Sequence, residues 1–247
     1  MNHRSFSSSG SGTALSPEAT RFGQTPATIS FAIREPGSAL THFAGLLLTL
    51  IGAGPLVMRA SMHGSAFTVA SLWVFLICTC LMYGASTTYH TVVLGEASTK
   101  RFRKLDHSMI SVMIAGTYTP ICLTVLRDSI GVPMLLGIWC IAIGGILVKV
   151  AWITCPKWFS SVLYVAMGWL SILAVRPLLE KLPLAAFLWL LSGGILYTIG
   201  AVIYALKLKC FNARHKYFGS HEVFHLFIMA GTLCHYVMMY AYIAYQH

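Results

Sequence analysis

Residues 133–153 read PMLLGIWCIAIGGILVKVAWI, an apolar run interrupted by a single charged side chain, Lys149. A helix of about 20 such residues is long enough to cross a hydrocarbon layer about 30 Å thick. The run lacks the alternation of polar and apolar residues that marks a strand of a membrane β-barrel. Because backbone groups inside lipid must be satisfied within the segment, we expect a transmembrane helix here.

Similar apolar blocks recur along the whole chain. Together they predict seven spans at about 39–58, 66–90, 106–126, 133–153, 158–177, 182–206 and 221–245. The composition agrees, since hydrophobic residues make up 57% of the chain and charged residues only 10%. A soluble domain has about 25% charged residues. The predicted fold is therefore all-α, a polytopic membrane protein built as a seven-transmembrane helix bundle.

The chain before the first span has a different composition. Residues 1–33 include the Ser/Gly-rich stretch 7–12 and hold too few apolar groups to form a core, so we expect a disordered cytoplasmic tail. Residues 34–247 form the predicted transmembrane domain. No apolar h-region of a cleavable signal peptide occurs before about Ala39, so the first span is expected to direct insertion.

The net charge of +10 comes from basic residues that lie between the apolar blocks, without interleaved aromatics. We interpret them as topology signals and expect no nucleic-acid partner. They concentrate in the tail and in the second, fourth and sixth connections, whereas the other connections hold Arg59, Arg127, Arg176 and Lys181. The positive-inside rule then places the N-terminus in the cytoplasm and, with seven spans, the C-terminus outside. We expect an integral multi-pass protein of the cell (inner) membrane.

Polar residues within the spans gather near the predicted cytoplasmic leaflet. The second span ends with Ser86 and His90, one helical turn apart, and the third opens with Asp106. The seventh opens with His221 and His225, again on one face of a helix. Counting the spans brings all five residues to the same side of the membrane.

Three imidazoles and a water molecule make the open tetrahedral arrangement of a catalytic zinc site. In that interpretation His90, His221 and His225 bind Zn²⁺, Asp106 holds or deprotonates the water, and Ser86 hydrogen-bonds the water or an oxyanion. Simpler structural roles are also open to these residues. A single histidine at a helix end is more often interfacial, and a carboxylate at the start of a span serves equally well as a helix cap.

The remaining histidines near the spans are weaker candidates for the metal site. His42 and His107 enter spans from the cytoplasmic side, where they are expected to be packing residues unless they support the ligands. His235 lies about 21 Å beyond His221 along the helix, too far to reach the same ion. Two roles are open to His235: it lines an internal cavity, or it hydrogen-bonds a neighbour.

Residues His221 to His225 also match the pattern H-E-x-x-H, in which two histidines bind zinc and the glutamate is the general base. An intramembrane metalloprotease is therefore an alternative, with Glu222 as base and Asp106 as third ligand. A place in the last span is awkward for that class.

A set of motifs resembles a known family. Glu35-Pro36, Thr41-His42, Ser86-x-x-x-His90, Leu105-Asp106 and His221-x-x-x-His225 together resemble the hemolysin III proteins, within the progestin and adipoQ receptor superfamily that includes the adiponectin receptors. The resemblance covers residues 34–245. It implies a seven-helix bundle with a cytoplasmic N-terminus and a zinc ion near the inner leaflet, bound by His90, His221 and His225.

The resemblance also implies that Asp106 contacts the zinc-bound water and that Ser86 lies beside it. Relatives in the superfamily are thought to hydrolyse lipid amides such as ceramide, so a membrane lipid is the expected substrate or ligand. Glu222 departs from the glutamine of the eukaryotic receptors, which leaves its role open. The long hormone-binding tail of those receptors has no counterpart here.

The leading hypothesis is a zinc-dependent hydrolase of a lipid amide. A cytolytic, pore-forming protein is an alternative that the family name suggests, although no row of charged residues that would line a conducting path is present. A lipid-responsive receptor is another. The sequence leaves the substrate, the oligomeric state and the occurrence of turnover open.

Overall fold

The structure is a computed structural model that describes residues 33–152, 157–206, 208–214 and 218–246. The predicted cytoplasmic tail lies almost wholly outside these residues. The described part is helical, without a strand, and its elements in chain order are α1 (Pro36–His63), α2 (Ala66–Thr91), α3 (Glu96–Leu123), α4 (Gly131–Ala151), α5 (Lys157–Trp169), the 3-10 helix η1 (Leu170–Ala174), α6 (Val175–Lys181), α7 (Leu184–Leu206), α8 (Lys209–Arg214), α9 (Ser220–Ala241) and the 3-10 helix η2 (Ile243–Tyr245).

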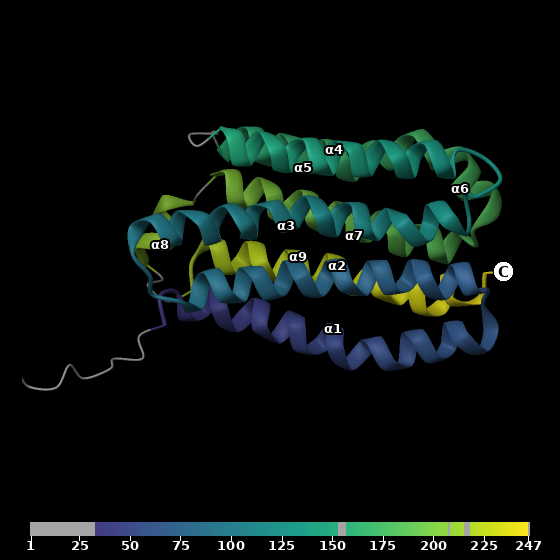
Figure 1. The fold of residues 1–247 in the computed structure, drawn as a ribbon, viewed down its shortest axis with the longest axis horizontal. Helices are drawn as coiled ribbons and strands as arrows, with labels where there is room; N and C mark the ends of the chain where they lie inside the picture. The colour runs from purple at the N-terminus through teal and green to yellow at the C-terminus, as the bar shows by residue number, and fades with distance from the viewer. Residues whose placement is uncertain (1–32, 153–156, 207, 215–217, 247) are drawn as a thin grey trace, which may run out of the picture. The chain divides into compact units, whose positions relative to one another are not determined.

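The long helices of the described unit run side by side (Figure 1). Helix α2 packs between α1 and α3, and α3 packs in turn against α4. Helix α9 packs against both α7 and α1, and α5 contacts α7 and α3. The last helix of the chain therefore returns to the first, and residues from the two ends of the described unit become neighbours.

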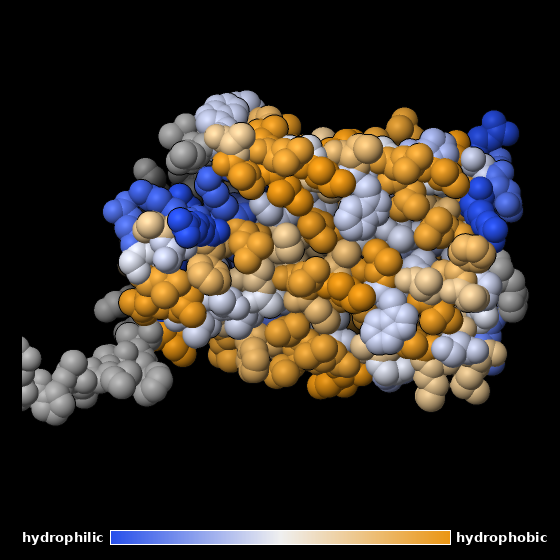
Figure 2. Space-filling model, viewed as in Figure 1, coloured by the Kyte–Doolittle hydropathy of each residue, from blue (hydrophilic) through white to orange (hydrophobic). Residues whose placement is uncertain are grey.

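Among the described residues, six stretches of helix are long and apolar enough to cross a membrane: Pro36–His63, Ala66–Thr91, Gly131–Ala151, Trp158–Lys181, Leu184–Leu206 and Ser220–Tyr245. Their outer surfaces carry exposed apolar side chains such as Leu48, Ile51 and Leu136. Figure 2 shows a hydrophobic band on one face of the molecule with hydrophilic residues toward its two ends. The prediction of a polytopic helical membrane protein is confirmed.

Helix α3 is the remaining predicted span. It begins at Glu96, ten residues before the predicted start at Asp106, and its first turns carry charged residues that lower its mean hydropathy. Glu96 and Lys100 pair across one exposed turn at 2.6 Å, which suits a helix that extends into water. The second half of α3 is largely buried within the bundle. The count of seven spans and the side of each terminus stay predictions.

The predicted span at 158–177 is a broken helix in the structure, because η1 separates α5 from α6. The break is supported by Tyr118 of α3, whose hydroxyl lies 2.8 Å from the Met167 carbonyl and accepts a hydrogen bond from the Ser171 N–H at 2.9 Å. Ser171 and Ala174 line an internal cavity. Irregular backbone at membrane depth is tolerated where protein or a cavity surrounds it.

Candidate metal centre

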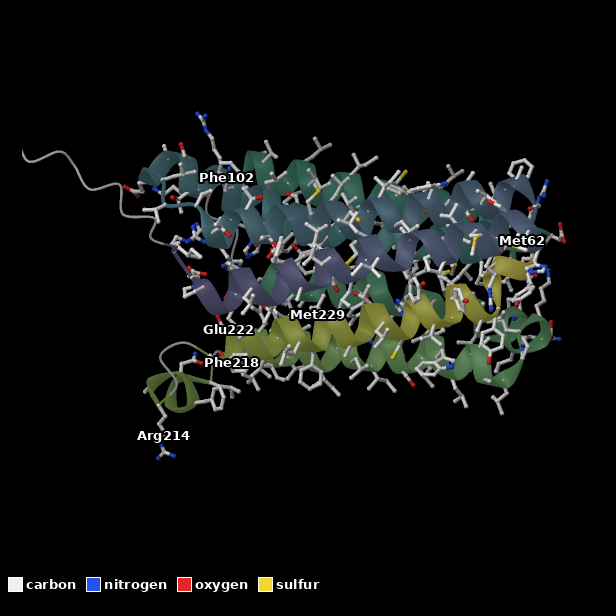
Figure 3. The ribbon with its side chains drawn as sticks, turned by 90° about the horizontal axis from the view of Figure 1, so that it is seen from below. Met62, Phe102, Arg214, Phe218, Glu222 and Met229 are labelled. Carbon is white, nitrogen blue, oxygen red and sulfur yellow. The ribbon has the colours of Figure 1, made fainter. Side chains whose placement is uncertain are left out.

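Three histidines from two helices meet at one end of the bundle. His90 lies in the last turn of α2, and His221 and His225 lie in the first turns of α9. Each offers a nitrogen atom within 4.8 Å of the others. Figure 3 shows Glu222, between the two α9 histidines, at the same end as Phe102 of α3 and opposite Met62 of α1. The structure thus brings together the three histidines that the sequence singles out.

The spacing of the imidazoles fits one small ion. Nε2 of His90 lies 3.3 Å from Nε2 of His221. Two nitrogens bound to a single tetrahedral zinc ion at about 2.0–2.1 Å lie about 3.4 Å apart. The ligand atom of His225 lies within 4.8 Å of the other two, so the three rings would need only to draw closer together to bind one ion. Neutral imidazoles are the usual nitrogen ligands of zinc, and all three side chains are well shielded from solvent.

Two residues of the first helix region hold the ligand rings in place. Nδ1 of His90 donates to Oε2 of Glu35 at 2.5 Å. Nδ1 of His225 lies 2.9 Å from Oγ1 of Thr41, whose own proton goes to the Ser38 carbonyl at 2.9 Å. Nδ1 of each ring therefore carries the proton, and Nε2 keeps its lone pair for a metal. Such outer hydrogen bonds are typical of zinc-binding histidines.

Glu35 belongs to the Glu35-Pro36 motif, but no role in the site could be assigned to it from the sequence. Its backbone N–H donates to the His90 carbonyl at 2.9 Å, so the segment before α1 is fastened to the end of α2. The hydrogen bond from His90 lowers the pKa of the Glu35 carboxyl, against the opposing effect of partial burial. The available signal was a carboxylate just before the first span, on the same predicted side as the histidines. Thr41 gave no signal beyond its place in the family motif.

His42, expected to be a packing residue, takes part in the site. Its ring stacks on that of His225 with centroids 3.5 Å apart, and its Nδ1 lies 2.7 Å from Oγ of Ser86. Asp106 is buried and its Oδ2 lies 3.3 Å from Nδ1 of His107. His42, Ser86 and Asp106 line the same cavity. The predicted polar residues Ser86 and Asp106 therefore face the space next to the histidines.

His107 holds the start of the buried part of α3. Its Nε2 lies 3.1 Å from the Tyr204 hydroxyl of α7, and its backbone carbonyl accepts hydrogen bonds from Lys149 of α4, at 3.1 Å, and Tyr164 of α5, at 2.5 Å. Three neighbouring helices thus fasten α3 one residue after Asp106. This fixes the position of the Asp106 carboxylate relative to the histidines.

Glu222 has structural partners for both carboxylate oxygens. The Ser38 hydroxyl of α1 donates to Oε1, and the Gly219 N–H donates to Oε2 at 2.7 Å. The side chain therefore caps the start of α9 and joins this helix to α1. A negative charge is favourable at the N-terminus of a helix. This use of the carboxylate disfavours Glu222 as the general base that the metalloprotease alternative requires.

The histidines stand between two hollows of different character. One is an apolar cavity of about 170 Å³ that runs from Ser86 and Asp106 to Leu126 and Leu178 at the opposite end of the bundle. The other is a polar vestibule of about 550 Å³, lined by residues that include Glu35 and His90. His107, Tyr204 and His221 border both. A ligand with a long apolar chain and a polar head has space on each side of the site.

Comparisons with known proteins agree with the motifs. The family described as "Haemolysin-III related" matches residues 31–236. The chain is 38% identical to Hemolysin-3 of Bacillus cereus over 202 residues, which cover 82% of this chain and 88% of that protein. It is 36% identical to the Hemolysin-3 homolog of Bacillus subtilis (82% and 91% covered), and 22% identical to the adiponectin receptor protein of Drosophila melanogaster (82% and 49% covered). With its six apolar spans, the protein is an integral multi-pass membrane protein. The chain belongs to the haemolysin-III related family.

Proposed function

We propose that the protein is a zinc-dependent hydrolase that cleaves an amide bond of a membrane lipid. The observation that carries the proposal is the place of His90, His221 and His225, between a long apolar cavity and a polar vestibule. An acyl chain would lie in the cavity and the polar part of the lipid in the vestibule. The amide bond between them would then lie beside the histidines.

The three imidazoles would hold the zinc ion through Nε2, with Glu35 and Thr41 fixing two of the rings. When bound, zinc would acidify water enough for it to attack a carbonyl near neutral pH. Three protein ligands leave one position open, which distinguishes a catalytic zinc site from a structural one. His221 and His225 line the cavity, and His90 and His221 line the vestibule, so a lipid carbonyl between the two would have access to that position.

Asp106 and Ser86 would supply the proton transfer and the hydrogen bond that the reaction needs. Asp106 lines the cavity and can accept a proton from the attacking water and pass it to the leaving amine. With the proton of His42 on Nδ1, Oγ of Ser86 accepts that hydrogen bond, and its own proton, which has the Asp106 carboxylate as a partner, would turn to the carbonyl oxygen during the reaction. A donor in such a place stabilises the charge that develops on the oxygen.

Asp106→Asn tests the proposal. In purified protein, we expect the rate of hydrolysis of a fluorescent long-chain amide such as a labelled ceramide to fall about 100- to 10,000-fold, because the proton acceptor is lost. The zinc content should stay that of the wild type. Glu222→Gln is the matched control among the carboxylates, and it should keep most of the activity.

Two results would contradict the proposal. Full activity of Asp106→Asn would remove Asp106 from the reaction, and loss of activity in Glu222→Gln with zinc retained would support the metalloprotease alternative instead. A wild-type protein that cleaves no lipid amide but releases dye from liposomes, equally in the variants, would favour a cytolytic role. A lipid that raises the thermal stability without being cleaved would favour a receptor.

A further inference from the structure

The polar vestibule beside the histidines contains a charged side chain that the proposed reaction does not use. Apart from histidines, the charged residues that line it in the described part of the chain are Glu35, Arg103 and Glu222. Glu35 supports His90, and Glu222 caps α9. Arg103 has no role in the site as described so far, and its place in the vestibule needs an explanation.

The two carboxylates of the vestibule already have partners within the protein. Oε2 of Glu35 accepts the proton of His90 at 2.5 Å, and Oε1 lies 3.4 Å from Nε of Arg34. Both oxygens of Glu222 accept hydrogen bonds, and the partial positive charge of the α9 N-terminus lies beside them. Both carboxylates are therefore in use, which disfavours the binding of a cationic group by either of them.

Arg103 differs from the carboxylates because none of the ion pairs among the described residues includes it. Its side chain is exposed, so a ligand in the vestibule can reach it. It lies near enough to Tyr89 and Tyr204, which also line the vestibule, for its charge to act on both hydroxyl groups. Arginine presents its N–H donors in a plane that matches phosphate and carboxylate oxygens. The vestibule thus offers a ligand an unpaired positive charge.

The position of Arg103 on α3 places this charge one helical turn from the proposed reaction. Asp106 and His107 follow it by three and four residues, so the three side chains share one face of the helix. Arg103 is about 4.5 Å nearer than Asp106 to the start of α3, measured along the helix axis. Figure 3 shows its neighbour Phe102 at the same end of the bundle as Glu222. A negative group a few bonds beyond the amide nitrogen of a bound lipid would lie beside Arg103.

The basic neighbours of Arg103 are placed differently. Lys100 pairs with Glu96, and Lys104 donates to a backbone carbonyl of α4. Arg101 is exposed and is not among the residues that line the vestibule. The positive-inside rule explains why this segment is basic. It does not explain why Arg103 lines the vestibule.

We propose that Arg103 binds a negatively charged group, such as a phosphate, in the polar part of the lipid just beyond the amide nitrogen. The lipid amide is then an acidic one. A neutral head group, such as a simple alcohol, would leave the charge of Arg103 unpaired. This inference rests on the proposed function for the direction in which the lipid lies, and it adds the chemical class of the polar part.

The test compares N-palmitoylethanolamine with its phosphate ester, two amides that differ only in the negative group. Each displaces a fluorescent long-chain amide from purified Asp106→Asn protein in an uncharged detergent, because cleavage is expected to be slow in this variant. We expect the phosphate ester to bind about 2- to 5-fold more tightly, the gain typical of an ion pair that stays in contact with water. This preference should fall as the salt concentration is raised.

Arg103→Gln, added to the same protein, should abolish the preference, and Arg103→Lys should keep part of it. Arg101→Gln is the matched control, because it removes the same charge from the same helix at a residue that does not line the vestibule. It should keep the preference. Inorganic phosphate at the same concentration should displace nothing, because a free ion lacks the chain that would occupy the cavity.

Equal affinity of the two amides would overturn the inference. A preference that survives in Arg103→Gln, or that falls equally in Arg101→Gln, would also overturn it. Displacement by inorganic phosphate as strong as by the ester would assign Arg103 to a free anion instead of a lipid. Because the measurement is of binding, its outcome is separate from hydrolysis. A protein that prefers the phosphate ester, but whose wild type cleaves no lipid amide, would overturn the proposed function alone.

Discussion

Glu35 shows how a single residue outside the spans can decide the properties of a site inside them. Its carboxylate fixes the tautomer and direction of the His90 ring, and its backbone fastens the start of the described unit to the end of α2. A residue that hydrogen-bonds a metal ligand in this way raises the basicity of the ligand. It also holds the ring in one orientation, so less entropy is lost when the metal binds. The role of Glu35 is thus tested by affinity rather than by turnover.

Glu35→Gln should weaken zinc binding about 10- to 100-fold, because an amide is a poorer acceptor for the His90 proton than a carboxylate. Competition with a fluorescent chelator measures the affinity in the purified protein. Glu96→Gln is the matched control, since Glu96 is exposed at the start of α3 and forms an ion pair with Lys100. An affinity that is unchanged in Glu35→Gln would show that the hydrogen bond to His90 contributes nothing.

The ligand histidines could be predicted from the sequence, whereas their supports could not. His221 and His225 are one turn apart in an apolar helix. Counting the predicted spans places His90, at the end of the second span, on the same side of the membrane as the start of the seventh. Glu35 and Thr41 carry no such pattern, because a carboxylate before a span and a threonine inside one are common. Only the packing of α1 against both α2 and α9 shows what they contact.

At the scale of elements, the contact between α2 and α3 positions His90 relative to Asp106. The two helices lie close together at Gly116, where a Cβ atom would lie 2.5 Å from Cβ of Cys78. Gly116→Ala should therefore force the two helices apart and lower the stability by about 1–3 kcal/mol, as overpacking usually does. Gly84→Ala on α2 is the control, because its Cβ would meet nothing within 4 Å.

Thermal unfolding in detergent distinguishes these two variants. The control should be as stable as the wild type or more so, since alanine suits a helix interior better than glycine by about 0.5–1 kcal/mol. If Gly116→Ala is as stable as Gly84→Ala, the close contact between α2 and α3 at Gly116 would be wrong.

Apolar length predicted where the helices lie but not how they begin or break. Helix α3 begins ten residues before the predicted start of the third span. Its first turns are polar, so a search for apolar runs does not include them. The break at Leu170–Ala174 lies between Gly168 and Pro177, and Pro177 has no N–H to donate to the carbonyl of Leu173. The hydrogen bonds of the Tyr118 hydroxyl, which come from another helix, could not be predicted from this local pattern.

At the scale of the whole molecule, the proposed site depends on the number of spans. If α3 crosses the membrane, the chain makes seven crossings, and the N- and C-termini lie on opposite sides. Epitope tags at the two ends, probed with antibody in intact and in permeabilised cells, measure this. We expect the C-terminal tag to be accessible in intact cells whose outer barriers have been removed, and the N-terminal tag only after permeabilisation. Two tags on the same side would contradict the seven-span topology.

Elemental analysis of protein purified without a polyhistidine tag measures whether His90, His221 and His225 hold one zinc ion. We expect about one zinc ion per chain in the wild type and a near-complete loss when His221 and His225 are both replaced by alanine. His63→Ala, at the other end of α1, should keep the metal. A wild-type protein without zinc, or a double variant that retains it, would rule out this zinc site.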